Sequence, residues 1–187
     1  MKIEMCFIPG LKLITPDIYK DTRGIFFETW QFKKYYDNGI QDYFLQDSVS
    51  LSIKNVRRGL HYQYPHSQAK LVSVLKGEIF DVVVDIRCTS PTFGNWFGII
   101  LNDIIFNQLY IPKGFAHGYN VLSNEAIISY KLSDYYNPSD EKGISCDDPD
   151  IKIKWKKSKN SQFIMNARDA QFPLLKNIPN NQLFNEF

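Results

Sequence analysis

Short β-type runs separated by turn residues extend over most of this chain, and this alternation limits the possible fold more than any other feature. In the clearest run, residues 80–86, apolar residues at the even positions alternate with Asp81, Val83 and Asp85 at the odd positions. Helical patterns are few and short. The pattern therefore predicts a mainly β protein, built as a closed or sandwiched antiparallel fold with a few short helices.

Turn residues indicate where individual elements end. Lys76-Gly77 predicts a hairpin between strands over 70–75 and 78–86. Gly39 is expected to stop a short helix over 30–38. Further extended segments are expected over 7–14, 43–53, 96–101 and 126–132.

The length of 187 residues suits one domain, 1–187, with a core large enough to need no metal or disulfide. No internal repeat or linker divides it. The Asn-rich end, about 176–187, is expected to be a loosely packed tail.

Composition narrows the classes of function. A net charge of +2 gives no reason to expect nucleic acid, and an aromatic share of 15% suits a pocket lined by rings. Cys6, Cys88 and Cys146 are odd in number and lack CxxC spacing, which argues against disulfides or a thiolate zinc site. Without a membrane-length apolar segment or a signal-peptide pattern, we expect a cytoplasmic protein with no membrane partner.

Residues 57–63 and 68–72 combine one His, one Lys, two Arg and two Gln within a strand-like region. Buried charge is costly unless it is paired or used, so this cluster indicates a site. A histidine near neutral pKa can remove a proton and a lysine can stabilise the resulting anion, which points to proton abstraction next to a carbonyl. Strict alternation places Arg57, His61 and Gln63 on one face. Arg58 would join them only through a bulge, for which Gly59 is the natural place.

Several alternatives stay open at this level. His61 alone could be a structural histidine, and Arg23 beside Gly24 could bind phosphate or lie in a solvated turn. Tyr130 could be a core aromatic or an acid, and nothing pairs Asp169. Residues 112–117 resemble the second metal motif of cupins, but the first motif lacks its second histidine, so we expect no metal. The residues alone indicate a small-molecule β-barrel enzyme with a His/Lys site.

Several motifs that occur together and in order resemble the dTDP-4-dehydrorhamnose 3,5-epimerase family. The resemblance covers roughly residues 7–173. The motifs are Asp21-Thr-Arg-Gly24 with Phe27-Glu28, Gln46-Asp47, Arg57-Arg-Gly-Leu-His-Tyr-Gln63, Gln68-Ala-Lys-Leu-Val72, Phe80–Arg87, Ser90-Pro-Thr-Phe-Gly94 and Ile111–Gly118.

The resemblance implies a cupin-type jelly-roll barrel, a homodimer and a dTDP-4-keto-6-deoxyhexose substrate, with no cofactor. It implies inversion at C3 and C5 of dTDP-4-keto-6-deoxy-D-glucose to give dTDP-4-keto-L-rhamnose. His61 would be the base, oriented by Asp169 as a carboxylate orients a histidine in hydrolytic triads. Lys70 would stabilise the enolate and Tyr130 would return a proton from the opposite face.

The family's contacts to nucleotide and sugar are carried over residue by residue. They correspond to Arg23, Phe26, Glu28, Gln46, Asp47, Ser48, Arg58, His117, Glu141 and Arg168. In the family the N-terminal arginine and glutamate reach the partner's site, so dimerisation is expected to be needed for tight binding.

The chain departs from the family pattern at a few positions. Ser48 replaces an Asn, Cys146 a Trp, Tyr119 a Phe, and Met165-Asn-Ala-Arg-Asp169 the usual Leu-Ser-x-Lys-Asp. Alternatives to the 3,5-epimerase are a mono-epimerase acting at C3 or C5 of a related nucleotide-4-ketosugar, a non-catalytic sugar-nucleotide-binding cupin and, third, a metal-dependent cupin enzyme.

Overall fold

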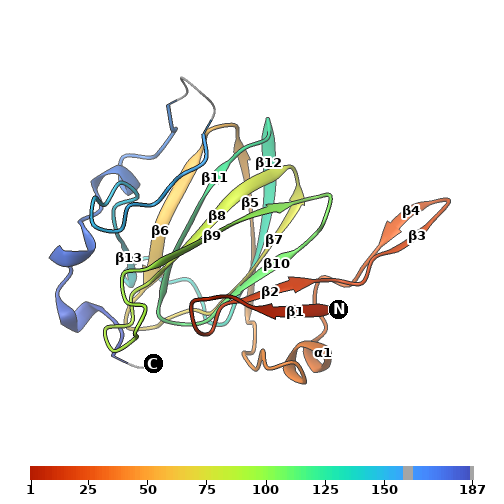
Figure 1. Cartoon of the computed structure of the whole chain (residues 1–187), viewed down its shortest axis with the longest axis horizontal. Coiled ribbons are helices and arrows are strands. Elements are labelled where there is room, and N and C mark those ends of the chain that lie inside the picture. The colour runs from red at the N-terminus through yellow and green to blue at the C-terminus, as the bar shows by residue number, and fades with distance from the viewer. Residues whose placement is uncertain (158–161, 186–187) are drawn as a thin grey trace.

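Two antiparallel sheets face each other in the computed structural model, which describes residues 1–157 and 162–185 (Figure 1). The larger sheet consists, in spatial order, of β1 (Lys2–Met5), β2 (Lys12–Thr15), β10 (Gln108–Ile111), β7 (Lys70–Lys76), β12 (Glu125–Leu132) and β5 (Gln46–Ile53). The smaller sheet consists of β13 (Glu141–Gly143), β6 (Arg57–Gln63), β11 (Phe115–Val121), β8 (Glu78–Asp85) and β9 (Trp96–Asn102). The predicted mainly β antiparallel fold is confirmed.

One helix and three short 3₁₀ turns are the helical elements among the described residues. Helix α1 (Phe32–Tyr36) ends just before Gly39, which has a φ of +79°, so the predicted short helix and its glycine stop are confirmed. The 3₁₀ turns are η1 (Asp169–Gln171), η2 (Leu175–Asn177) and η3 (Asn180–Gln182). None of the helices in the described ranges is long and apolar enough to cross a membrane.

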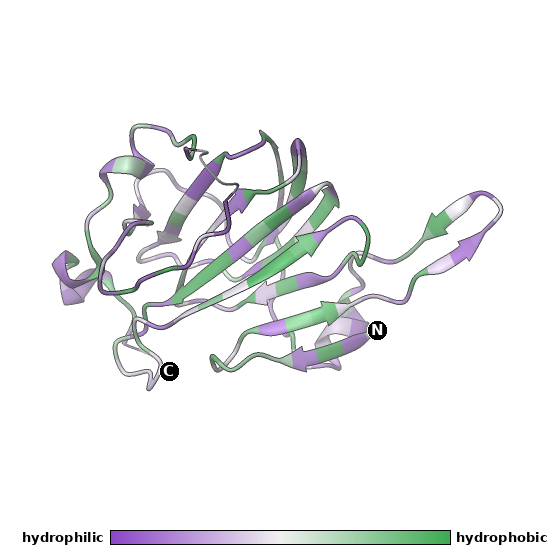
Figure 2. Cartoon of the chain, turned by 45° about the horizontal axis from the view of Figure 1, so that its top comes forward, coloured by the Kyte–Doolittle hydropathy of each residue, from purple (hydrophilic) through white to green (hydrophobic). Residues whose placement is uncertain are grey.

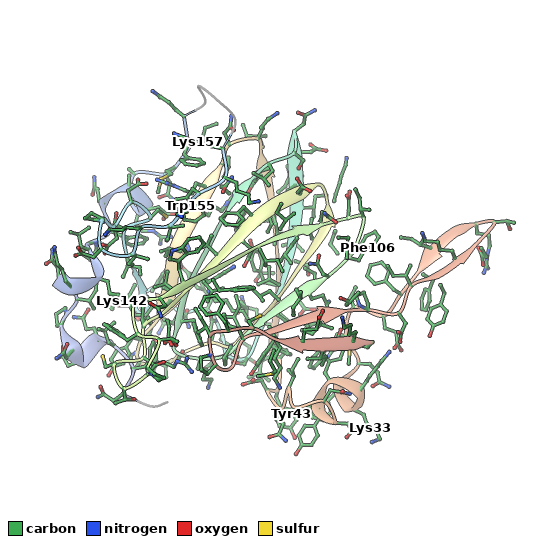
Figure 3. The ribbon with its side chains drawn as sticks, viewed as in Figure 1. Lys33, Tyr43, Phe106, Lys142, Trp155 and Lys157 are labelled. Atoms are coloured by element: carbon green, nitrogen blue, oxygen red, sulfur yellow. The ribbon has the colours of Figure 1, made fainter. Side chains whose placement is uncertain are left out.

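The alternation in β8 serves two separate apolar layers. Ile79 and Val83 point between the sheets and pack with residues such as Val72 and Ile128 of the larger sheet. The even positions point outward into a second layer that the C-terminal segment covers. Trp155 of this segment lies over that outer face, with its ring 6.3 Å from that of Phe80 (Figure 3). Both faces of β8 are therefore buried, and the predicted grouping of even and odd positions on opposite faces is confirmed.

The predicted hairpin about Gly77 is wrong. β7 pairs with β10 and β12, whereas β8 pairs with β11 and β9 in the other sheet. Gly77, with a φ of +82°, turns the chain from one sheet to the other, and a Cβ there would lie 2.1 Å from the Glu125 carbonyl oxygen. A one-residue glycine loop between strands suits a hairpin and a corner between sheets alike, so the local signal does not decide between them.

Two terminal segments also differ from expectation. The extended run over 7–14 is interrupted, because β1 ends at Met5 and β2 begins at Lys12. At the other end, Ile178 and Leu183 are buried in the outer apolar layer, so the expected loose tail is packed through residue 184. Residues 186–187 of that tail lie outside the described residues.

A two-stranded hairpin, β3 (Tyr19–Asp21) and β4 (Gly24–Phe26), projects away from the two sheets (Figure 1). All six strand residues are exposed, and Tyr19, Ile25 and Phe26 have exposed fractions of 62%, 46% and 67%. Figure 2 shows β4 as an apolar stretch standing clear of the body. Exposed aromatic area on an arm this far from the core is unusual for an isolated chain.

Candidate active site

The imidazole of His61 in β6 is held by the carboxylate of Asp169 from the C-terminal segment. His61 Nε2 lies 2.9 Å from Asp169 Oδ1, and the Gly59 N–H donates to Asp169 Oδ2 at 3.0 Å. Burial acts to raise the pKa of Asp169, but the hydrogen bonds from His61 and Gly59 outweigh it and hold the pKa below its ordinary value. An ionised carboxylate only accepts hydrogen bonds, so Nε2 carries the hydrogen and Nδ1 keeps a free lone pair.

The ring of His61 is also fixed from the side. Phe172, just after η1, packs its edge against the imidazole with centroids 5.5 Å apart. A Cβ on Gly143 of the neighbouring strand β13 would lie 2.3 Å from the Phe172 ring. The absence of a side chain at 143 thus makes room for the ring that supports His61.

A bulge in β6 brings Arg58 to the same hollow as His61. His61 is opposite His117 of β11, but Arg58 is opposite Tyr119, so β6 contains one extra residue there. Gly59 has a φ of +123°, and a Cβ on it would lie 2.6 Å from Gly118 Cα. The bulge predicted at Gly59 is confirmed.

The same bulge turns Arg57 away from His61, and the strict alternation expected for Arg57 is therefore wrong. Arg57 is buried and makes two hydrogen bonds to Asp147, at 2.6 and 2.8 Å. Its guanidinium lies 4.4 Å from the Phe163 ring. Arg57 belongs to the outer layer, where it anchors the C-terminal segment.

Two adjoining hollows, of about 150 and about 290 Å³, open between the sheets at this point. The residues that line both are Ser48, His61, Lys70, Tyr130 and Glu141. Three of the four predicted catalytic side chains, from β6, β7 and β12, therefore meet at one cavity, and Asp169 supports the first from behind. We call the two hollows together the pocket.

The charge of Lys70 is sensitive to its surroundings. Burial lowers its pKa to about 8, although the carboxylates of Asp81 and Glu141 act in the opposite direction. Lys70 is therefore mainly an ammonium at neutral pH and can stabilise a negative charge that develops in the pocket.

His117 forms a second His–Asp pair inside the barrel. His117 Nε2 lies 2.9 Å from Oδ2 of Asp81, which is fully buried in β8. Burial lowers the pKa of His117, and the nearby Asp81 charge opposes that shift. Asp81 was not expected at the site. A charged residue in the middle of a mostly apolar strand was the available signal.

Gln46 and Ser48 share the inner face of β5. Gln46 Nε2 donates to Ser48 Oγ at 3.0 Å, and Gln46 Oε1 accepts from the Tyr136 N–H at 2.9 Å. The Tyr136 hydroxyl donates to Glu141 at 2.7 Å and its side chain lines the pocket. From the sequence, Tyr136, like Tyr130 and Tyr135, could be a core aromatic, and it was not assigned a role at the site. Its position in the loop after β12 gave no periodic signal.

Arg168 and Glu141 close another side of the pocket. The Arg168 guanidinium bonds both carboxylate oxygens of Glu141, one of them at 3.2 Å. The two expected binding residues therefore occupy each other in this structure and present a polar, bidentate group at the rim.

Four expected binding residues lie away from the pocket of their own chain. Asp47 faces outward on β5 and accepts from Lys131 at 2.9 Å. Glu28 lies 3.4 Å from Lys34, beyond the projecting hairpin. Arg23 and Phe26 are on the hairpin itself, and the Arg23 side chain, 88% exposed, bonds Asp21. The structure does not bring these four together with His61.

The described residues contain no group of three or more His, Cys, Asp or Glu side chains suited to hold a metal. What the pocket offers instead is a histidine with a free ring nitrogen, an ammonium group and a phenol. Such a set can remove a proton, stabilise the anion and return a proton.

Comparison with known proteins gives consistent matches along the chain. The sequence profile of the dTDP-4-dehydrorhamnose 3,5-epimerase family matches residues 6–177. The dTDP-4-dehydrorhamnose 3,5-epimerase of Methanothermobacter thermautotrophicus is 42% identical over 172 residues, which cover 92% of this chain and 93% of that protein.

Solved structures agree in fold. The dTDP-6-deoxy-D-glucose-3,5-epimerase of Legionella pneumophila, in complex with dTDP-4-keto-L-rhamnose, matches with a TM-score of 0.96 and 48% identity over 100% of this chain and 98% of that one. A 3′-monoepimerase from Streptomyces bikiniensis, in complex with dTDP-quinovose, matches with a TM-score of 0.85 and 29% identity over 91% and 86% of the two chains. The expected cupin-type jelly-roll barrel is confirmed. On the profile match and the 42% identity, this chain belongs to the dTDP-4-dehydrorhamnose 3,5-epimerase family.

Proposed function

We propose that this chain is an isomerase that inverts C3 and C5 of dTDP-4-keto-6-deoxy-D-glucose and releases dTDP-4-keto-L-rhamnose, without a cofactor. One observation carries the proposal: the His61–Asp169 pair, Lys70 and Tyr130 converge on one pocket. Relatives named for 3,5-epimerisation support the same reaction.

The first step is removal of the proton from a carbon next to the C4 ketone. The free lone pair of His61 Nδ1 takes this proton, because Nε2 is occupied by Asp169. The electron pair of the broken C–H bond forms a C=C bond, and the ketone oxygen becomes an enolate oxygen. The Lys70 ammonium stabilises the charge on this oxygen.

The second step returns a proton from the opposite face of the planar enolate. The O–H bond of Tyr130 breaks, the C=C electron pair forms the new C–H bond, and the ketone re-forms. Tyr130 is left as a phenolate and His61 as an imidazolium, so both exchange protons with water before the next carbon reacts. Removal and return on opposite faces invert the carbon.

The dTDP part would bind at the polar rim. Arg58 and Arg168 carry planar guanidinium groups suited to the diphosphate, and Arg168 would exchange its bonds with Glu141 for bonds to the ligand. Gln46, Ser48 and Glu141 would offer hydrogen bonds beside them. His117, at the pocket wall, would contact the sugar.

We further propose a homodimer in which the β3–β4 hairpin reaches the partner's pocket. The exposed apolar hairpin supports this, and so does β5, the edge strand of its sheet. On β5, Val49, Leu51 and Ile53 face outward with exposed fractions of 65%, 60% and 58%. Arg23, Phe26 and Glu28 would then complete the partner's site. Three free cysteines support a reducing, cytoplasmic location.

A mono-epimerase on a related nucleotide-4-ketosugar is the second candidate. The structural match to a 3′-monoepimerase, which covers most of both chains, supports this second candidate. Base, lysine and acid would be shared, so the same geometry serves both reactions. The difference would lie in how the pocket, including Ser48, positions the ring.

Proton NMR of dTDP-4-keto-6-deoxyglucose with the enzyme in deuterated water tests the proposal. Deuterium at both C3 and C5 is the expected result. Label at one carbon would establish a mono-epimerase. No label, with dTDP binding intact, would contradict catalysis on this substrate and favour a sugar-nucleotide-binding protein.

A further inference from the structure

A row of hydroxyl groups leads from Tyr130 in the pocket to Arg58. The Tyr130 hydroxyl lies 3.0 Å from Ser50 Oγ, and Ser50 Oγ lies 3.0 Å from the Tyr119 hydroxyl. The Tyr119 hydroxyl lies 3.1 Å from Ser52 Oγ, which accepts a hydrogen bond from Arg58 Nε at 3.1 Å. The mechanism above uses the two ends of this row and leaves the three middle hydroxyls without a role.

The direction of the hydrogen bonds in this row follows from its Arg58 end. A guanidinium donates and never accepts, so Ser52 Oγ is an acceptor toward Arg58. Ser52 and Tyr119 have exposed fractions of 3% and 2%, so water does not satisfy their hydrogens. Among the described contacts, the remaining partner for the Ser52 hydrogen is the Tyr119 oxygen.

The donors and acceptors of the other hydroxyls in the row can be assigned in the same way. Tyr119 accepts from Ser52 and therefore gives its own hydrogen to Ser50. With its oxygen accepting from Tyr119, Ser50 has its hydrogen available for the Tyr130 oxygen, which lies 3.0 Å away. Tyr130 then accepts within the row, and its own hydrogen is left to point into the pocket. Hydrogen bonds aligned in one direction polarise and strengthen one another.

We propose that Tyr119, together with Ser52, is a positioning residue that orients the Ser50 hydroxyl, so that Ser50 donates to the Tyr130 oxygen, aims the Tyr130 proton at the substrate and stabilises the phenolate left after transfer. This inference rests on the proposed role of Tyr130 as the acid. In this arrangement every hydrogen bond of the row points the same way. The row begins at the charged Arg58 and ends at the Tyr130 oxygen, which becomes negative when the proton leaves.

Electrostatics at Tyr130 show why such support matters. Burial is the main cause that raises the pKa of Tyr130 well above its ordinary value, and the neighbouring Tyr119 and Asp81 add to this shift. The hydrogen bond with Ser50 acts against it. A buried phenol without that donor is a poorer acid, so the orientation of the Ser50 hydroxyl matters.

Tyr119→Phe removes the central link with little change in volume. With substrate in deuterated water, His61 still removes protons, and a deuteron returned from its own face gives labelled substrate of unchanged configuration. A deuteron returned through Tyr130 gives labelled, inverted product. We expect the ratio of inverted to retained label to fall about tenfold in Tyr119→Phe, because the hydrogen bond that directs the Ser50 hydroxyl toward Tyr130 is lost. Ser50→Ala should lower the ratio at least as much, and Ser52→Ala less.

Tyr35→Phe is the matched control, because it also removes a buried tyrosine hydroxyl, one that bonds Gln108 at 2.6 Å outside the row. Its ratio should equal that of the wild type. An unchanged ratio in Tyr119→Phe, with Tyr130→Phe losing inversion, would overturn the inference and leave the proposed function intact. Inversion that persists in Tyr130→Phe would instead remove the acid assignment itself. If Tyr119→Phe does not fold, the order Ser50→Ala, Ser52→Ala, wild type decides the matter: equal ratios in all three contradict the inference.

Discussion

Two histidines face each other across the pairing of β6 with β11, and each bonds an aspartate, yet their surroundings differ. The His61 side chain is 24% exposed, and its partner Asp169 comes from the C-terminal segment outside the sheet. The His117 side chain is 5% exposed, and its partner Asp81 lies in the adjacent strand inside the barrel. Both aspartates are fully buried.

The difference between the two pairs shows that a His–Asp contact does not by itself make a base. A base must reach the substrate and hold its tautomer, and His61 meets both conditions through its exposure and the doubly bonded Asp169. His117 is enclosed, and burial lowers its pKa. We therefore expect His61 to move protons, and His117 to bind and, through Asp81, to shape the field at Lys70.

The largest effect should come from His61→Asn. Turnover should fall by about 10³-fold, because general base catalysis is lost. The affinity for dTDP should change little, since His61 acts on the sugar ring. Steady-state turnover and titration calorimetry with dTDP measure the two quantities. Affinity that falls as far as turnover would make His61 a binding residue.

Asp169→Asn should be next, with turnover lowered by about 100-fold while His61 remains in place. An amide can offer a hydrogen to Nε2, which favours the wrong tautomer and leaves the Gly59 N–H less well bonded. The matched variant is Asp81→Asn, which acts on the other pair and should lower turnover less at pH 7. If turnover falls equally in Asp169→Asn and Asp81→Asn, the two His–Asp pairs do not differ in function as we infer.

His117→Asn should raise KM about tenfold with a smaller change in kcat, because it removes a buried imidazole from the pocket wall. Initial rates over a range of substrate concentrations separate the two parameters. A loss confined to kcat would show that His117 takes part in proton transfer after all.

The smallest expected effect is a shift in the pH dependence of kcat/KM, caused by the ionisation of Lys70. Lys70 has a pKa of about 8 and must be charged, so kcat/KM should be halved near pH 8 and fall as pH rises further. The Asp81 carboxylate raises the pKa of Lys70, so Asp81→Asn should move this falling limb to lower pH, while Asp169→Asn should leave it in place. Lys70→Arg should remove the limb up to about pH 10. A limb that stays unchanged in Lys70→Arg would belong to another group.

Much of this comparison could be predicted from the sequence, because strand alternation is local. It put Asp81 on the face of β8 opposite the apolar even positions, and Gly59 marked the bulge that brings Arg58 beside His61. The side of the sheet on which a residue lies depends on its near neighbours.

The rest depends on contacts between distant segments. Asp169 is 108 residues from His61, and no local pattern pairs them. Only the resemblance suggested the contact. A one-residue loop at Gly77 fits two topologies, and packing chose the corner between sheets. The exposed β3–β4 hairpin projects away from the two sheets of its own chain (Figure 1). Its expected contribution to a pocket therefore depends on a second copy of the chain.

The central claim is that His61, and not His117, removes the proton. The most direct test is deuterium exchange into dTDP-4-keto-6-deoxyglucose, followed by NMR, for His61→Asn and His117→Asn side by side at saturating substrate. We predict no label at C3 or C5 with His61→Asn and clear label with His117→Asn. Label that persists in His61→Asn, or that is lost only in His117→Asn, would contradict the account.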